Sequence, residues 1–208
     1  KIKDLEKIKY LYFPLHYEPE LVLLVQSQDY LDQLNVIMNI SRNLPLNTQL
    51  AVKDHPLMFG RRKPDFYKTI LGIPNVVLVD STENSIEIIK LSFGVITIIG
   101  SVGMEAFFHN KPAITLSNAF YNFIPSVKKV ESFHEISNEV LNFENYKFDL
   151  NEKLILIETI KELSIAINLN QLIQKLDLGK INNSEKVELD DFIDFLQENI
   201  FKKIGNND

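Results

Sequence analysis

The sequence contains no cysteine among its 208 residues. Disulfide bonds, thiolate metal sites and cysteine nucleophiles are therefore excluded. Basic residues are not in excess either, because 22 lysines and arginines stand against 28 aspartates and glutamates and give a net charge of −6. Since nonspecific binding to nucleic acid needs a basic face, we expect no nucleic-acid partner.

Long apolar runs are also missing. No stretch reaches the roughly 20 apolar residues that a membrane-spanning helix needs, and no signal peptide is recognisable. We therefore expect a cytoplasmic protein, with at most a peripheral association with the inner face of the cytoplasmic membrane. Because the first residue is Lys1 rather than methionine, we also expect a further domain upstream.

The sequence alternates between strand-like and helix-like patterns, as an α/β protein does. Short β-branched runs and helical patterns follow one another over the first two thirds of the chain, which predicts βαβ units around a parallel sheet. The segment 15–28 is expected to be a loop. Strands are expected at residues 10–14, 49–53, 76–79, 94–99, 112–116 and 127–130, and helices at 30–44, 65–71, 85–91, 102–109 and 136–143.

We expect two parts, a Rossmann-like nucleotide-sugar-binding domain over residues 1–145 and a helical extension over 146–208. The extension has helical patterns at 154–169, 172–176 and 189–201, with a linker at 182–184. Asp190, Asp191 and Asp194 imitate a metal motif. Acidic residues at the start of an amphipathic helix are explained by the helix dipole, so we expect no metal and no cofactor.

The most informative stretch runs from Ile96 to Ala106. A β-branched run ends in Gly100-Ser101-Val102-Gly103 and passes directly into a helical pattern. This predicts a buried strand, a tight glycine turn and a helix whose first N–H groups are free to bind phosphate. The alternative is an ordinary strand-to-helix turn in which Ser101 caps the helix.

Glu105 lies at the fourth position of the expected helix, where it is not a capping-box partner. A carboxylate at this place suits hydrogen bonds to the two hydroxyls of a ribose. The alternative is an acidic residue that is merely favourable near the helix dipole. His109 ends the same helix, where a cation is favourable, and we expect it to be structural.

His55 follows the second expected strand and precedes Pro56, which favours an extended conformation. An imidazole at the end of a strand can stabilise a leaving phosphate or act as a general acid, and Lys53 can add positive charge beside it. The next loop carries Arg61, Arg62 and Lys63. This basic cluster is either a solvated turn or a binding site for the sugar donor or acceptor.

Further polar residues also follow expected strands, at the edge where open parallel sheets bind ligands. His16, Glu18 and Glu20 lie after the first strand and either belong to the cleft or form an exposed turn. Asn84 and Ser85 lie at the start of the helix over 85–91. Asn84 with Glu87 fits a capping box there, and the loop at 80–84 is a candidate nucleotide contact.

Several of these strings resemble those of the capsule polysaccharide biosynthesis proteins, which include the Kdo transferases of capsule assembly. The resemblance runs in order from Tyr10 to Val130, and Lys111-Pro112-Ala113 matches a strand of that family. The strings that carry it are Phe13-Pro14-Leu15-His16-Tyr17-Glu18-Pro19-Glu20, Val52-Lys53-Asp54-His55-Pro56, Pro74-Asn75-Val76 and Gly100-Ser101-Val102-Gly103-Met104-Glu105-Ala106.

The resemblance implies one half of a GT-B glycosyltransferase, namely the C-terminal domain that binds the sugar donor, with an acceptor domain upstream. It implies that His55 lies near the donor phosphate, that Ser101 and Gly103 hold phosphate, and that Glu105 meets the ribose. The chain departs from the family at Asn110, where glycine is usual, and at Glu18, where glutamine is frequent.

We therefore expect transfer of a sugar from a nucleotide-activated donor, such as CMP-Kdo, to a bacterial surface or capsular polysaccharide. The expected partners are the nucleotide sugar, the glycan acceptor and the upstream domain. One alternative is a nucleotide-sugar epimerase of GT-B-like fold. Another is a noncatalytic domain that binds a nucleotide or a partner.

Overall fold

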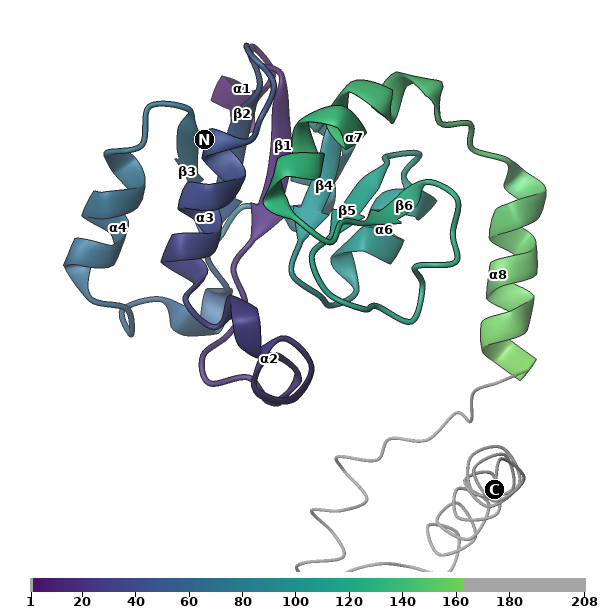
Figure 1. Ribbon diagram of the computed structural model, residues 1–208, viewed down its shortest axis with the longest axis horizontal. Helices are drawn as coiled ribbons and strands as arrows, with labels where there is room; N and C mark the ends of the chain where they lie inside the picture. The colour runs from purple at the N-terminus through teal and green to yellow at the C-terminus, as the bar shows by residue number, and fades with distance from the viewer. Residues whose placement is uncertain (1, 163–208) are drawn as a thin grey trace, which may run out of the picture. The chain divides into compact units, whose positions relative to one another are not determined.

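Six parallel strands form one sheet in the computed structural model of the chain (Figure 1). Their order is β3-β2-β1-β4-β5-β6, and each neighbouring pair is parallel. The structure describes residues 2–162. The strands are β1 (Tyr10–Pro14), β2 (Gln49–Lys53), β3 (Val76–Val79), β4 (Gly94–Thr97), β5 (Ala113–Thr115) and β6 (Val127–Lys129).

The strand predictions are confirmed, with differences at the ends of the last three. β1, β2 and β3 have the predicted bounds. β4 ends at Thr97 rather than Ile99, because the Thr97 hydroxyl donates to the carbonyl oxygen of Ile99 at 2.8 Å and the chain turns there. The carbonyl of Ile98 still pairs with the N–H of Ser117 at 2.9 Å, so the chain stays beside β5 as it leaves the sheet.

Seven helices are described within residues 2–148. Two of them were not predicted: α1 at the start, and α2, which lies inside the expected loop over 15–28. They are α1 (Ile2–Leu5), α2 (Leu21–Gln26), α3 (Gln33–Arg42), α4 (Pro64–Leu71), α5 (Ser85–Leu91), α6 (Val102–Phe108) and α7 (Ile136–Asn142), with short 3₁₀ turns at Gln28–Tyr30, Pro56–Met58, Phe133–Glu135 and Phe143–Asn145.

Capping side chains set two of the helix starts. α3 begins at Gln33 rather than at Tyr30, because the Asp32 carboxylate accepts the N–H of Asn35 at 3.1 Å. Asn84 caps α5 as predicted and accepts the N–H of Ile86 at 2.8 Å. The Glu87 side chain pairs with Lys90 instead of returning to Asn84, so only half of the capping box forms.

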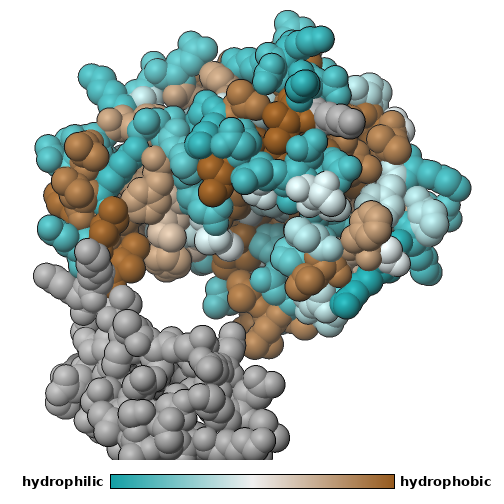
Figure 2. Space-filling view, turned by 180° about the vertical axis from the view of Figure 1, so that it is seen from behind, coloured by the Kyte–Doolittle hydropathy of each residue, from teal (hydrophilic) through white to brown (hydrophobic). Residues whose placement is uncertain are grey.

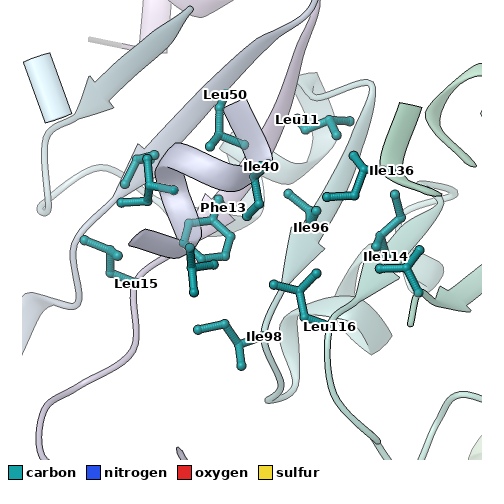
Figure 3. Close-up of a cluster of buried hydrophobic side chains, with 14 of the residues drawn as sticks. Leu11, Phe13, Leu15, Ile40, Leu50, Ile96, Ile98, Ile114, Leu116 and Ile136 are labelled. Carbon is teal, nitrogen blue, oxygen red and sulfur yellow. The ribbon is translucent and has the colours of Figure 1, made fainter. Parts of the chain in front are cut away.

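Helices cover both faces of the sheet, which is why its strands read as continuous apolar runs. Successive residues of a strand point to opposite faces. Leu11 and Phe13 of β1 face a cluster that includes Ile40 of α3, and Figure 3 shows these side chains together. Tyr10 and Tyr12 point to α5, where the Tyr10 hydroxyl donates to the carbonyl oxygen of Ile88 at 2.7 Å.

Apolar side chains also reach the surface. Figure 2 shows them as separate patches among hydrophilic side chains on one face. On α2 only Leu23 is buried, whereas Leu21 is 73% exposed and Val25 is 65% exposed. Within residues 2–162 no helix is long and apolar enough to cross a membrane.

A second unit begins at Asp149. It contains α8 (Leu150–Glu162), which starts four residues before the predicted helix over 154–169. The rest of that helix, the helices expected at 172–176 and 189–201, the linker at 182–184 and the residues Asp190, Asp191 and Asp194 lie outside the described residues.

Candidate functional site

Loops from three strands meet at the carboxyl edge of the sheet. The strand order reverses between β1 and β4, and such a switch point is where open α/β sheets bind ligands. A pocket of about 220 Å³ lies there. We call it the histidine pocket, and the residues that define it are His16 and Glu20 after β1, His55 after β2, and Gly100, Ser101 and Val102 after β4.

The histidine pocket brings together residues that the sequence placed at three separate strand ends. His55 is half-buried and precedes the 3₁₀ turn Pro56–Met58. Its ring Nδ1 accepts the backbone N–H of Leu57 at 3.2 Å. The backbone N–H of His55 donates to the Asp54 carboxylate at 2.8 Å. The ring meets Tyr17 edge-on, with 5.9 Å between centroids. Both the backbone and the ring of His55 are therefore held in place.

Lys53, Asn84 and Ser85 line a neighbouring pocket of about 610 Å³ rather than the histidine pocket. The Lys53 ammonium is buried and donates to the Ser85 hydroxyl at 3.2 Å. Burial lowers the pKa of Lys53, while the carboxylates of Asp54 and Asp80 oppose that shift. Pro56, the residue after His55, also lines this pocket.

The glycine turn after β4 is built around Tyr121, a residue that the sequence analysis missed. Gly100 has φ +106°, a conformation that favours glycine, and the Tyr121 hydroxyl donates to its carbonyl oxygen. At Gly103 a Cβ would lie 2.8 Å from Tyr121 Cε2. The second glycine therefore makes room for a tyrosine ring. No spacing rule connects these two positions, so only the tertiary structure reveals the contact.

Replacing Gly103 by alanine is expected to lower the free energy of unfolding by about 1–3 kcal/mol, as overpacking typically does. The new methyl group would also push the Tyr121 ring away from the Gly100 carbonyl. Urea unfolding of the single variants and of Gly103→Ala with Tyr121→Leu checks the cause. If the clash is responsible, the double variant loses less stability than the two single losses added together.

Ser101 and Glu105 interact with each other at the start of α6. Ser101 has helical backbone angles and makes no capping hydrogen bond, so the capping role considered for it is not observed. Its hydroxyl instead donates to Glu105 Oε1 at 2.6 Å. Burial raises the pKa of both Tyr12 and Tyr121 to about 12, and the nearby charge of Glu105 adds to each rise.

Arg62 ties the loops after β1 and β2 together, and because its side chain is buried it is not part of a solvated turn. Its side chain is 4% exposed and that of Asp54 is 5% exposed, with 3.1 Å between Nε and Oδ1. Its Nη2 donates to the carbonyl oxygen of His16 at 2.7 Å. The Tyr67 hydroxyl donates to the other Asp54 oxygen at 2.6 Å. We call Arg62, Asp54 and Tyr67 the arginine clamp.

The arginine clamp also positions the Glu18 side chain. Its carboxylate pairs with Arg62 Nη1 at 2.7 Å and accepts a hydrogen bond from Gln33. Glu18 lines a separate pocket of about 640 Å³ together with Arg61 and Lys63, both of which are exposed. The structure therefore does not bring Glu18 into the histidine pocket. Among residues 2–162, no group of three or more histidine, aspartate or glutamate side chains could hold a metal ion.

The sheet order and the pockets at its carboxyl edge define a Rossmann-like α/β domain, as the sequence predicted. The family model described as capsule polysaccharide biosynthesis protein matches residues 23–134, which is more than half of the chain. The chain belongs to this family, and the resemblance found in the sequence is confirmed.

Three known proteins are similar to parts of this chain. The capsule polysaccharide export protein KpsS of Escherichia coli is 28% identical over 102 residues, which are 45% of this chain and 25% of that protein. This chain therefore matches about a quarter of the length of its curated relative.

The UDP-GlcNAc 2-epimerase of Methanocaldococcus jannaschii superposes with a TM-score of 0.52 at 15% identity, over 76% of this chain and 49% of that chain. At that identity the likeness concerns the fold alone. KpsC of Thermosulfurimonas dismutans, a beta Kdo 2,7 transferase, has a TM-score of 0.49 at 19% identity, over 64% of this chain and 44% of that chain.

Proposed function

We propose that this chain binds the nucleotide-activated sugar in a glycosyltransferase that builds a bacterial surface or capsular polysaccharide. The observation that carries the proposal is the histidine pocket, in which His55 and the Gly100 turn come together at the switch point of the sheet. Membership of the capsule polysaccharide biosynthesis family supports a sugar polymer as the product.

In the proposed reaction, negative charge develops on the phosphate as its bond to the sugar breaks. Since the Nδ1 of His55 accepts the Leu57 N–H, a neutral ring carries its proton on Nε2, which can then donate to the phosphate. The backbone of Gly100 to Gly103 would hold the phosphate from the other side, with Lys53 adding positive charge nearby. Fixed hydrogen-bond donors at a developing charge stabilise a transition state strongly.

The nucleoside is proposed to lie against Glu105. Its carboxylate, held by the Ser101 hydroxyl at 2.6 Å, would accept hydrogen bonds from the ribose. The loop over 80–84 and the pocket at Asn84 and Ser85 offer a place for the rest of the nucleotide. We propose a nucleoside monophosphate sugar such as CMP-Kdo as the sugar donor, and no metal or cofactor is needed in this scheme.

The acceptor site is proposed to lie on an upstream domain, and the reaction at the cytoplasmic side of the membrane. An epimerase is the second candidate, because a UDP-GlcNAc 2-epimerase shares the fold. Release of an epimerised sugar in the absence of an acceptor would favour it. A noncatalytic role is the third, because the relative KpsS is named as an export protein. In that case a nucleotide would bind without any turnover.

Calorimetric titration of the chain with CMP, UDP, GDP and CDP tests the proposal. We expect one nucleotide to bind about tenfold or more tightly than the others, which corresponds to about 1.4 kcal/mol. Glu105→Gln is expected to weaken that binding by about tenfold to a hundredfold, since a hydrogen bond to a charged group is worth about 1.5–3 kcal/mol. Glu87→Gln is the matched control, because Glu87 is exposed and pairs with Lys90. Failure of all four nucleotides to bind would overturn the proposal.

A further inference from the structure

The two imidazoles of the histidine pocket have opposite hydrogen-bonding states. The Nδ1 of His16 lies 2.8 Å from Glu20 Oε2. A carboxylate can only accept a hydrogen bond, so in a neutral ring the proton of His16 is on Nδ1 and its Nε2 carries a lone pair. In His55 the Nδ1 accepts the Leu57 N–H, so its Nε2 carries the proton. One ring offers the pocket a donor and the other an acceptor.

The His16 acceptor has nothing to bind within the described chain. Its side chain is 9% exposed, and no residue of the range 2–162 lies within hydrogen-bonding distance of the buried Nε2. A buried polar atom without a partner is costly. The ring lines the histidine pocket, and its Cε1 lies 3.5 Å from the position that a Cβ would take on Gly100. The unused nitrogen is therefore next to the turn that is proposed to hold phosphate.

The charged and titratable groups around His16 lie in the segments that follow β1, β2 and β4. Glu20 touches its ring, and Arg62 binds its carbonyl oxygen at 2.7 Å on the backbone side. Glu18 is turned away and paired with Arg62. Across the pocket stand His55 and, beyond Ser101, Glu105.

We propose that His16 is a proton-coupled ligand of the donor phosphate: when the nucleotide binds, Nε2 takes one proton from solvent and donates it in a hydrogen bond to a phosphate oxygen, while Glu20 holds Nδ1. This inference rests on the proposed function and adds a second phosphate ligand and its protonation to it. No bond of the ligand breaks in this step. The only change is one proton moved from solvent to Nε2.

The chemistry of phosphate requires that proton. A fully ionised phosphate has no hydrogen to give, so a neutral His16 would set a lone pair against the lone pairs of the ligand. The imidazolium ring donates from both nitrogens. It can therefore bridge the Glu20 carboxylate and the phosphate, and charge-assisted hydrogen bonds of this kind are the strong ones. Glu20 is thus a positioning residue for His16.

Proton uptake on binding is the experiment that tests the inference. The tightest binder among CMP, UDP, GDP and CDP is titrated into the 208-residue chain in buffers with different ionisation enthalpies, and the slope of the observed enthalpy gives the protons taken up. His16→Asn keeps an N–H donor for Glu20 and removes Nε2. We expect wild type to take up more protons than this variant, by up to one per nucleotide. The ligand's own titration is common to both proteins and cancels in the difference.

Affinity should follow the same linkage. Wherever nucleotide binding takes up a proton, the Kd of wild type should rise with pH by up to about tenfold per pH unit more than that of His16→Asn. His134→Gln is the matched control, since this exposed histidine bonds to Asn43 and lies outside the histidine pocket. It should keep the proton uptake of wild type. Nitrogen shifts of the His16 ring, measured by NMR on wild type, should change from the Nδ1–H form to imidazolium when the nucleotide is added.

The outcomes separate the two proposals. If a nucleotide binds and wild type takes up no more protons than His16→Asn, the role of His16 is wrong and the proposed function stands. The same holds if the His16 ring stays neutral in the NMR titration, a measurement that does not depend on whether the variant folds. If none of the four nucleotides binds, the proposed function fails and this inference fails with it.

Discussion

His55→Ala is expected to lower the rate of sugar transfer by about 10²- to 10³-fold, while nucleotide affinity changes far less. The reason is that its Nε2–H would act on charge that develops as the phosphate leaves, and losing one such donor typically costs this much in kcat. An interaction made mainly in the transition state appears in kcat rather than in binding. Turnover is measured with the full-length protein and a nucleotide sugar, and nucleotide affinity by calorimetry.

Two further variants sharpen the His55 experiment. His55→Gln places an amide N–H near the position of Nε2 and should retain part of the rate that alanine loses. His109→Ala is the matched control, since His109 follows the last residue of α6 and does not line the histidine pocket. Unchanged turnover in His55→Ala would contradict the role given to this residue, as would an equal loss in both alanine variants.

Arg62→Met is expected to lower the free energy of unfolding by about 3–5 kcal/mol, because removing one partner of a buried pair leaves the other charge uncompensated. Here the other charge is Asp54, whose side chain is 5% exposed. The bridge to Glu18 contributes little, since Glu18 is 39% exposed. Urea unfolding measures the loss, which exceeds that of most single substitutions.

A double-variant cycle tests this explanation. Asp54→Asn removes the stranded charge, so the pair Arg62→Met with Asp54→Asn should lose clearly less stability than the two single losses added together. Arg61→Met is the control, since the side chain of this exposed neighbour donates to the Tyr17 hydroxyl at 2.8 Å and has no buried charge as its partner. Its loss should cost less than about 1 kcal/mol. An Arg62→Met protein as stable as wild type would show that the clamp does not hold the two loops.

The sequence predicted most of the fold, and the reasons are local. β1, β2 and β3 were placed to the residue because their apolar runs are bounded by polar residues or turn signals. Asn84 indicated the start of α5, because its side chain can cap a helix. α2 was missed because the apolar run from Leu21 to Val25 has no polar side to give it a helical period, and in the structure most of that run is exposed.

For the candidate site, too, one part could be predicted from the sequence and another part could not. That His55 and Gly100 belong to one site could be inferred from the sequence, because the carboxyl ends of parallel strands share one edge of a sheet. The partners of these residues could not be inferred. The contact between Gly103 and Tyr121 joins α6 to a loop residue 18 positions later in the chain, and the arginine clamp connects three segments.

By itself, the sequence determined the α/β class, the strands, the family and the edge of the sheet where the candidate site lies, because patterns of apolar residues and turn signals act over short distances along the chain. Only the tertiary structure decided that Arg62 is buried in an ion pair and that Gly103 makes room for a tyrosine. It also decided that His16 and His55 have Nε2 atoms in opposite hydrogen-bonding states at one pocket. Burial, close packing and the choice of hydrogen-bond partner depend on residues distant in sequence, and folding alone brings those residues together.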